Sequence, residues 1–384
     1  MLIIKLKPKK ETPIFKGHPW LFSGAIDAAQ GAPEKEGACR VLDSRGHFVC
    51  QGMYNPLSQI AIRVLTLGKE PINKEFFELR IKKAIKLRND VIGKDTTCCR
   101  LINAEGDNIP GLIVDMYGDV IVIQFICPGI ERFKEDLVDI FHELYPNAYI
   151  HERSDIRFRN TEGLRPLSGP LYGELAQGDL IVKEMGLSFV VDVLTGDGTG
   201  FYLNNRTNRF KIRSMAKDKA VLDLFSYTGA FSLHALAGGA KSVVSVDSSS
   251  PAQAMLKKNM ALNQAAPFIW RHAKDDVARF LSNDKTKYDL IICDPPNMAK
   301  DQDDYTKINS LAIDRLSQGG KLITTAISGP QFTPMDLLKV INRSARRASR
   351  SARIIEPLYQ APDFPLNPSH PQGIDIFGYI VYVD

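Results

Sequence analysis

The chain has 384 residues, of which 44% are hydrophobic and 24% are charged, and its formal net charge is +5. These proportions are typical of an ordinary soluble globular protein. No run is long and apolar enough to span a bilayer, which argues against a membrane protein. The mildly basic balance permits nucleic-acid binding without requiring it.

Six cysteines follow no disulfide or metal-binding pattern. Cys98 and Cys99 are adjacent rather than spaced as CxxC, which indicates neither zinc nor a redox pair, so no metal is expected. The first residues of the sequence do not have the charged-then-apolar pattern of a leader. Together these features favour a reducing cytoplasm as the location.

Residues 1–70 read as short alternating strands between Gly, Pro and Asn, with Arg40–Leu42, His47–Cys50 and Ile60–Leu65 as the clearest. This pattern predicts a small β-barrel. Trp20, after His18 and Pro19, either faces RNA at the surface or packs in the core. A Trp after Pro more often packs in the core, which favours the structural alternative.

Residues 71–172 predict a central α+β domain. A helix is expected from Asn73, because Phe77, Ile81 and Ala84 recur at helical spacing. Strands then alternate with one helix, Ile130–Leu144. Gly169, Pro170 and Gly173 indicate a hinge or hairpin before the third domain, residues 173–384.

Residues 221–247 predict one βαβ unit. A strand, Val221–Leu224, is followed by a turn at Gly229, a helix over Phe231–Ala237 and a second strand that ends in Asp247. An acid at that place accepts hydrogen bonds from both ribose hydroxyls of an adenosine. The alternative for Asp247 is a helix N-cap, since SSSP follows it.

The turn itself discriminates between cofactors. A pyrophosphate-binding turn has GxGxxG, whereas DLFSYTGAF has one glycine and a carboxylate, Asp223, before it. A carboxylate repels phosphates and suits the ammonium and sulfonium of S-adenosylmethionine. The sequence therefore predicts a methyl-donor site and disfavours a nicotinamide-dependent dehydrogenase.

Two pieces downstream complete the predicted site. Asp276, preferred over Asp275, is placed to accept the adenine amino group while Val277 offers its backbone amide. The apolar strand Leu290–Cys293 must end at the two prolines that follow Asp294, at the edge where open α/β sheets bind ligands. The predicted catalytic residues are Asp294, Pro295 and Asn297, and the predicted cofactor-binding residues are Asp223, Phe225, Tyr227, Thr228, Gly229, Asp247, Ser248, Asp276 and Val277.

Several motifs together resemble the ribosomal-RNA large-subunit methyltransferase I family. They are FSYTGAF, the DPP strand end, GTGFYLNNRTNR, RLINAEGDNIPGLIVDMYGD, GHPWLFSGAI and QGMYNPLSQIAIRVL. The resemblance implies an RNA-binding PUA-like domain at 1–70 and a Rossmann-like methyltransferase domain at 173–384. It also implies S-adenosylmethionine as cofactor, large-subunit rRNA as partner and cytosine C5 as the methylated atom. A homodimer is left open.

One departure puts that chemistry in doubt. The family attacks cytosine C6 with a cysteine thiolate in a Ser-Cys-Ser-Gly turn, but here, in GGKLITTAISGP, Ile327 occupies the cysteine's place. Unaided cytosine C5 is too weak a nucleophile to take the methyl group. Cys293, nearest in sequence to the predicted site, is expected to be an ordinary buried strand cysteine. Two alternatives follow: methylation of a guanine amine or ring nitrogen, and a non-catalytic RNA-binding or ribosome-assembly factor.

Two further features bear on RNA. The loop before the first cofactor strand departs from the family at Gly198 and at Asn204–Asn205, which suggests a changed substrate. A stripe of arginines, placed on one face of a single helix, either follows a phosphate backbone or is a solvated face. The predicted RNA-binding residues are Trp20, Arg206, Arg343, Arg346, Arg347 and Arg350, with Arg353 continuing the stripe.

Overall fold

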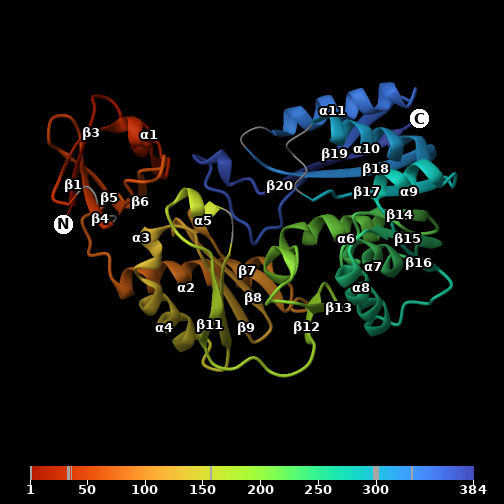
Figure 1. Ribbon diagram of the computed structural model, residues 1–384, viewed down its shortest axis with the longest axis horizontal. Coiled ribbons are helices and arrows are strands. Elements are labelled where there is room, and N and C mark those ends of the chain that lie inside the picture. Colours follow the sequence, from red (N-terminus) through yellow and green to blue (C-terminus); the bar gives the residue numbers. More distant parts are fainter. Residues whose placement is uncertain (1, 33–34, 36, 156–157, 297–301, 330–331) are drawn as a thin grey trace. The chain divides into compact units, whose positions relative to one another are not determined.

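The computed structural model describes residues 2–32, 35, 37–155, 158–296, 302–329 and 332–384, which form two compact units (Figure 1). The first unit comprises residues 1–180, 192–201 and 362–373. The second comprises residues 181–191, 202–361 and 374–384. The chain thus passes between the units five times, after residues 180, 191, 201, 361 and 373.

The first unit begins with a six-stranded sheet in the order β2-β6-β5-β4-β1-β3. Its elements are β1 (Leu2–Leu6), α1 (Thr12–Phe15), β2 (Trp20–Leu21), η1 (Ser23–Ala25), β3 (Ile26–Gln30), β4 (Gly37–Leu42), β5 (Phe48–Tyr54) and β6 (Ile62–Thr66). Alternate residues such as Ile4 and Leu6 face a common apolar core. The expected small β domain is confirmed.

A five-stranded sheet follows in the same unit, in the order β11-β10-β9-β8-β7. Its elements are α2 (Lys74–Val91), β7 (Cys98–Asn103), η2 (Ala104–Asp107), β8 (Leu112–Tyr117), β9 (Val120–Phe125), α3 (Pro128–Glu131), α4 (Lys134–Leu144), β10 (Tyr149–Ser154), α5 (Phe158–Thr161) and β11 (Leu167–Tyr172). The prediction of one helix over Ile130–Leu144 is wrong. Two helices stand there, because Phe133 (φ −97°, ψ 15°) leaves the helical region between them.

The second unit is built on a seven-stranded sheet in the order β16-β15-β14-β17-β18-β20-β19. Two short elements of the remaining chain, η3 (Asp197–Gly200) and η5 (Pro371–Gly373), belong to the first unit. The elements of the second unit are β12 (Leu180–Glu184), β13 (Leu187–Val191), η4 (Leu203–Asn205), α6 (Arg206–Met215), β14 (Ala220–Leu224), α7 (Ala230–Ala237), β15 (Ser242–Asp247), α8 (Ser250–Leu262), β16 (Trp270–Lys274), α9 (Val277–Asn283), β17 (Tyr288–Cys293), α10 (Gln302–Arg315), β18 (Leu316–Ile327), α11 (Pro334–Arg347), β19 (Ala352–Tyr359) and β20 (Ile376–Val383). β14 to β18 run parallel, and β20 is antiparallel to both of its neighbours, β18 and β19.

This topology places a ligand site. Numbered from β14, the strand order reads 3-2-1-4-5-7-6, and its direction reverses between β14 and β17. Open α/β sheets bind ligands outside the carboxyl ends of the strands at such a switch point. The predicted Rossmann-like α/β domain is therefore confirmed. None of the helices in the described part of the chain is long and apolar enough to cross a membrane.

Helices cover both faces of this sheet. Leu222 and Cys293 pack with residues of α9, α10 and α11, whereas Val221 and Ile292 pack with residues of α6 and α7. Neighbours along a strand point to opposite faces. The side chains of β14, β17 and β18 are thereby divided between an α9–α11 face and an α6–α7 face.

Candidate active site

The turn after β14 has an unusual backbone. Phe225 (φ 59°), Tyr227 (φ 46°) and Gly229 (φ 82°) are all left-handed. A Cβ on Gly229 would lie 2.9 Å from Cγ of Leu256, so glycine is needed both for the conformation and for the contact with α8. Strained backbone of this kind concentrates at ligand-binding sites.

Asp223, near the end of β14, is fully buried. Its Oδ2 accepts hydrogen bonds from the Ser232 amide (3.0 Å) and the Ser232 hydroxyl (2.6 Å). Burial raises the pKa of Asp223 to about 7, against the lowering effect of Ser232, and the carboxylates of Asp294 and Asp247 add to the rise. A cation bound beside Asp223 would favour the ionised form of this carboxyl group.

Three buried polar atoms around this turn have no hydrogen-bond partner among the described residues. They are Oδ1 of Asp223, Oγ of Ser226 and Oγ1 of Thr228. Buried polar groups in folded proteins are nearly always paired. A cluster of unpaired ones on a left-handed turn indicates a ligand that supplies the missing partners.

Asp247 ties this turn to the neighbouring strand. Its Oδ2 accepts from the Tyr227 amide (2.9 Å), and its Oδ1 accepts from the Ser249 amide (2.8 Å). The N-cap of α8 is Ser249, whose hydroxyl accepts from the Ala252 amide, so the N-cap alternative for Asp247 is wrong. Ser248 lies beside it, exposed.

Asp276 follows β16, as expected, and is exposed. Its Oδ1 accepts from the Arg279 amide at 2.9 Å and so caps α9, in which Val277 is the buried first residue. Asp275 forms an ion pair with the Arg279 side chain. Asp276 is thus both a helix cap and a carboxylate at the carboxyl edge of the sheet.

Asp294 directly follows β17, and both of its oxygens accept hydrogen bonds. Nδ2 of Asn205 donates to Oδ2 at 3.0 Å, and the Thr325 hydroxyl donates to Oδ1. Burial raises the pKa of Asp294, while Thr325, Arg209 and Asn205 act in the opposite direction. Pro295 is buried beside it, and the predicted Asn297 lies outside the described residues.

The position of the missing cysteine lies near this acid. Thr325 contacts Asp294, and Ile327, two residues further along β18, shares its face of the strand. Cys293 packs in the core on the α9–α11 face, and burial raises the pKa of its thiol. It is an inert core cysteine, as expected.

Sequence reasoning did not include Asn205, Asn208 and Thr325 among the site residues. Nδ2 of Asn208 donates to Oδ1 of Asn205 at 2.9 Å, which extends the network around Asp294. Asn205 was noted only as a departure from the family. The available signal was the density of asparagine in LNNRTN, in which Asn205 and Asn208 are buried.

Comparisons with known proteins agree with this geometry. Residues 4–67 match a PUA-like domain, and residues 155–374 match an S-adenosylmethionine-dependent methyltransferase. A ribosomal RNA large subunit methyltransferase I from Vibrio vulnificus is 37% identical over 396 residues, 98% of each chain. The chain belongs to the ribosomal RNA large subunit methyltransferase I family.

Solved structures share the fold of this methyltransferase. A protein from Streptococcus mutans described as a SAM-dependent methyltransferase has a TM-score of 0.86 at 23% identity, with 100% of both chains covered. A second methyltransferase, complexed with SAH, has a TM-score of 0.87 at 23% identity, also over 100% of both chains. The two-unit architecture is therefore that of known methyltransferases.

The residues present fit S-adenosylmethionine, the cofactor of the matched family. Asp223 offers a buried carboxylate oxygen to a cation, and the Ser226 and Thr228 hydroxyls offer unpaired polar atoms. The turn has no second glycine for a pyrophosphate. The methyltransferase site thus has unsatisfied groups of the kind that an ammonium and a sulfonium attract.

The arginine stripe differs from its prediction. The prediction that Arg343 to Arg353 lie on one helix is wrong, because α11 ends at Arg347 and Arg353 lies in β19. Arg350 is partly buried, and its guanidinium donates to backbone carbonyls, among them those of Leu316 and Asp384. Arg343 contacts Gln302 (2.7 Å) and Asp303 (3.7 Å). Arg346 and Arg347 are exposed on the helix.

Arg206 lies in a buried charge cluster rather than on the surface. Its Nε is 3.7 Å from Glu184, to which Arg209 donates two hydrogen bonds of 2.6 Å. Burial alone would raise the pKa of Glu184, but Arg209 and His234 hold it well below its usual range. The cluster joins β12 to α6 and α7.

Trp20 is packed within the first unit. Its indole N–H donates to Glu105 at 2.8 Å, and its ring centroid is 4.2 Å from that of His370. These contacts favour the structural alternative for Trp20. The side chain is tied into the unit at both its polar and its apolar surface.

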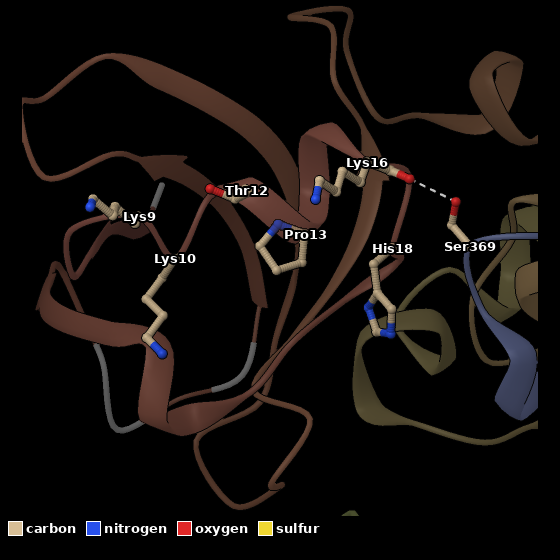
Figure 2. Close-up of a pocket in the computed structure, with 7 residues that line it drawn as sticks. All are labelled: Lys9, Lys10, Thr12, Pro13, Lys16, His18 and Ser369. Carbon is tan, nitrogen blue, oxygen red and sulfur yellow. Dashed lines mark hydrogen bonds between the residues drawn. The ribbon is translucent and has the colours of Figure 1, made fainter.

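A basic hollow lies on the N-terminal domain (Figure 2). It has a volume of about 580 Å³ and is lined by Lys9, Lys10, Thr12, Pro13, Lys16, His18 and Ser369. The Ser369 hydroxyl donates to the Lys16 carbonyl at 2.7 Å and closes one side of it. Three lysines around a hollow form an anion-attracting surface.

Proposed function

We propose that this protein methylates a base of large-subunit rRNA with S-adenosylmethionine, and that it does so without a cysteine adduct. The name of the relatives supports the substrate. The observation that carries the second part is that Thr325, which contacts Asp294, shares its face of β18 with Ile327, the residue in the place of the cysteine. Methylation of cytosine C5 would require a thiolate at this position, but the side chain there is the branched hydrocarbon of Ile327.

The residues divide the work. When bound, the cofactor supplies a methyl group whose S–C bond breaks, leaving the electron pair on sulfur, as the bond from carbon to the base forms. Asp223, Ser226 and Thr228 bind its polar groups, and Asp247 and Asp276 lie where the ribose and the adenine are expected. Asp294, whose pKa is raised by burial, accepts the proton that the base nitrogen loses.

A guanine nitrogen is the substrate atom that this set of groups suits. A ring nitrogen or exocyclic amine needs removal from its stack and an acceptor for its proton, and needs no covalent adduct. Asp294 provides that acceptor, and Pro295 gives the loop a rigid backbone. This chemistry replaces cytosine C5 methylation in the proposal.

The remaining domains supply RNA affinity. We assign residues 1–70 to a PUA-like RNA-binding domain, 71–172 to a central α+β domain and 173–384 to the methyltransferase domain, with the cytoplasm as location. The lysine-lined hollow supports contact with phosphates, because Lys ammonium groups release counterions from a nucleic-acid backbone.

The test is transfer of labelled methyl from S-adenosylmethionine to rRNA from cells that lack this protein, followed by nucleoside analysis. A methylated guanosine is the expected product. 5-Methylcytidine would show that another nucleophile exists. Absence of transfer with retained RNA and cofactor binding would favour the non-catalytic assembly factor.

A further inference from the structure

We infer that Asn205 and Thr325 are positioning residues that fix Asp294 as a pair of hydrogen-bond acceptors, and that this pair selects a guanine over a cytosine. The inference rests on the proposed function, because it assumes that an RNA base enters this site. It goes further by assigning base choice to residues outside the reacting set.

The orientation of the Asn205 amide is determined by its neighbours. Asn208 donates to Oδ1 of Asn205, so the Nδ2 group of Asn205 must face Asp294. Asn205 and Asn208 are 1% and 2% exposed, so these bonds are shielded from bulk solvent. The amide is therefore a fixed donor.

The adjoining residue anchors the same loop from the other side. Nδ2 of Asn204 donates to Asp375 at 2.7 Å, and the Asn204 carbonyl accepts from the Ala361 amide at 2.8 Å. The Asp375 carbonyl in turn accepts from the Ser328 amide at 2.9 Å, just after β18. The loop that carries Asn205 is thus held at the end of the strand that carries Thr325.

The bonds leave Asp294 with a defined capacity. An ionised carboxylate has about four lone-pair sites and no donor. Asn205 occupies one site on Oδ2, and Thr325 occupies one on Oδ1. Within the described ranges no other residue donates to Asp294, so one site on each oxygen remains there, and both donors favour the ionised form.

Two adjacent acceptors distinguish the bases by their edges. Guanine presents N1–H and N2–H side by side, so it can donate to both oxygens. Cytosine presents one N–H beside the N3 lone pair, which would face a carboxylate oxygen without a proton between them. Sites built to pair with a substrate donor reject analogues that lack it, because a buried acceptor is left unpaired.

The first experiment measures binding rather than transfer. Short RNAs that differ only at one central nucleotide, guanosine, inosine or cytidine, are titrated into the full-length protein with S-adenosylhomocysteine present. The guanosine RNA is expected to bind at least about tenfold more tightly than the cytidine RNA, with inosine, which has one donor fewer, between them. Equal affinities, or no binding of any of the three, would overturn the inference.

Matched variants separate positioning from folding. Thr325→Val keeps the shape of the side chain but removes the donor, and Asn205→Ala removes the other; each is expected to lower the guanosine preference several-fold. Thr325→Ser retains a hydroxyl and should restore the preference. Asn283→Ala, at an exposed asparagine of α9, is the control. An unchanged preference in Thr325→Val, with an unchanged melting temperature, would refute the role.

The pH dependence gives a readout that a purely structural role does not move. The preference needs ionised Asp294, so it is lost as pH falls through the pKa of that group. Because Thr325 lowers this pKa, Thr325→Val should move the loss to higher pH. Failure of the rRNA transfer assay would refute the proposed function without altering these binding ratios, so the two failures are distinguishable.

Discussion

The carboxyl edge of the seven-stranded sheet and the hollow of the N-terminal domain both carry charge, but they hold it differently. At the sheet edge, Asp223 is buried and Asp294 is partly buried, and each carboxylate accepts hydrogen bonds from named donors, Ser232 for Asp223 and Asn205 and Thr325 for Asp294. In the hollow, Lys9, Lys10 and Lys16 line an open space with a volume of about 580 Å³. The sheet edge fixes the orientation of each carboxylate by hydrogen bonds, whereas the hollow brings several positive charges together without fixing their orientation.

This difference fits the role proposed for each region. Methyl transfer needs groups aligned with a reacting atom, and alignment is maintained by burial and hydrogen bonds. A phosphate backbone is recognised through charge and tolerates mobile side chains. Single substitutions should therefore have large effects at the sheet edge, and grouped substitutions should have small, graded effects in the hollow.

The largest effect is expected for Asp294→Asn. The variant keeps the shape of the side chain but cannot accept a proton, so the rate of methyl transfer should fall by about 10³-fold while cofactor affinity changes little. Single-turnover transfer and calorimetric titration measure the two quantities. Asp304→Asn, at an exposed acid of α10, is the control, and a transfer rate within threefold of the unmodified protein would contradict the assignment.

Asp223→Asn should lower the affinity for S-adenosylmethionine by about a hundredfold, since it removes a buried carboxylate that faces a cation. Stability should change in the opposite sense. The pKa of Asp223 is raised from 3.8 to about 7 in the folded state. The contribution of this group to the free energy of unfolding is therefore fully present below pH 4 and is lost as the pH rises through 7.

Without cofactor, Asp223→Asn should therefore unfold with a free energy higher by about 4 kcal/mol at pH 8 and nearly unchanged at pH 4. Denaturant unfolding at both pH values measures this. A variant that is less stable at pH 8 would show that the carboxylate is not an unsatisfied charge in the folded protein.

Charge reversal in the hollow should give an intermediate effect. Lys9→Glu, Lys10→Glu and Lys16→Glu together are expected to weaken RNA binding about tenfold at 0.1 M salt and to reduce the salt slope by about 2, as for three lost phosphate contacts. The control carries the same charge change at exposed Lys217, Lys241 and Lys285. Equal losses in both variants would indicate a response to net charge alone.

The smallest effect is expected for Arg346→Glu with Arg347→Glu. Both arginines are exposed on α11, so at most two phosphate contacts are lost and RNA affinity should fall about threefold or less. Filter binding at several salt concentrations tests this. A loss as large as that of the lysine variant would place the main RNA contact on α11.

The fold was predictable where the pattern is local. The strands around residues 221–247 and 290–293 lie within two residues of their predicted bounds, because a buried parallel strand is a short apolar run between turn residues. The end of α11 was not predictable. Neither Gly nor Pro marks it, and the chain turns through a left-handed Ser349 (φ 52°).

The site was predictable only in part, for a similar reason. Asp223 and Asp294 stand next to strand ends that the sequence shows directly. The hydrogen bond from Asn205 joins residues 89 positions apart, and the bond from Thr325 joins residues 31 apart. Such partners are determined by how the strands and loops pack, and no local pattern signals them.

The five passages of the chain between its two units have a consequence for inheritance. A gene fragment with one start and one end cannot encode either unit alone, since residues 181–191 and 374–384 belong with 202–361, and residues 192–201 and 362–373 belong with 1–180. A recombination event that moves one contiguous gene segment would therefore separate some strands from the other strands of their sheet. The two units of this protein are expected to be inherited together.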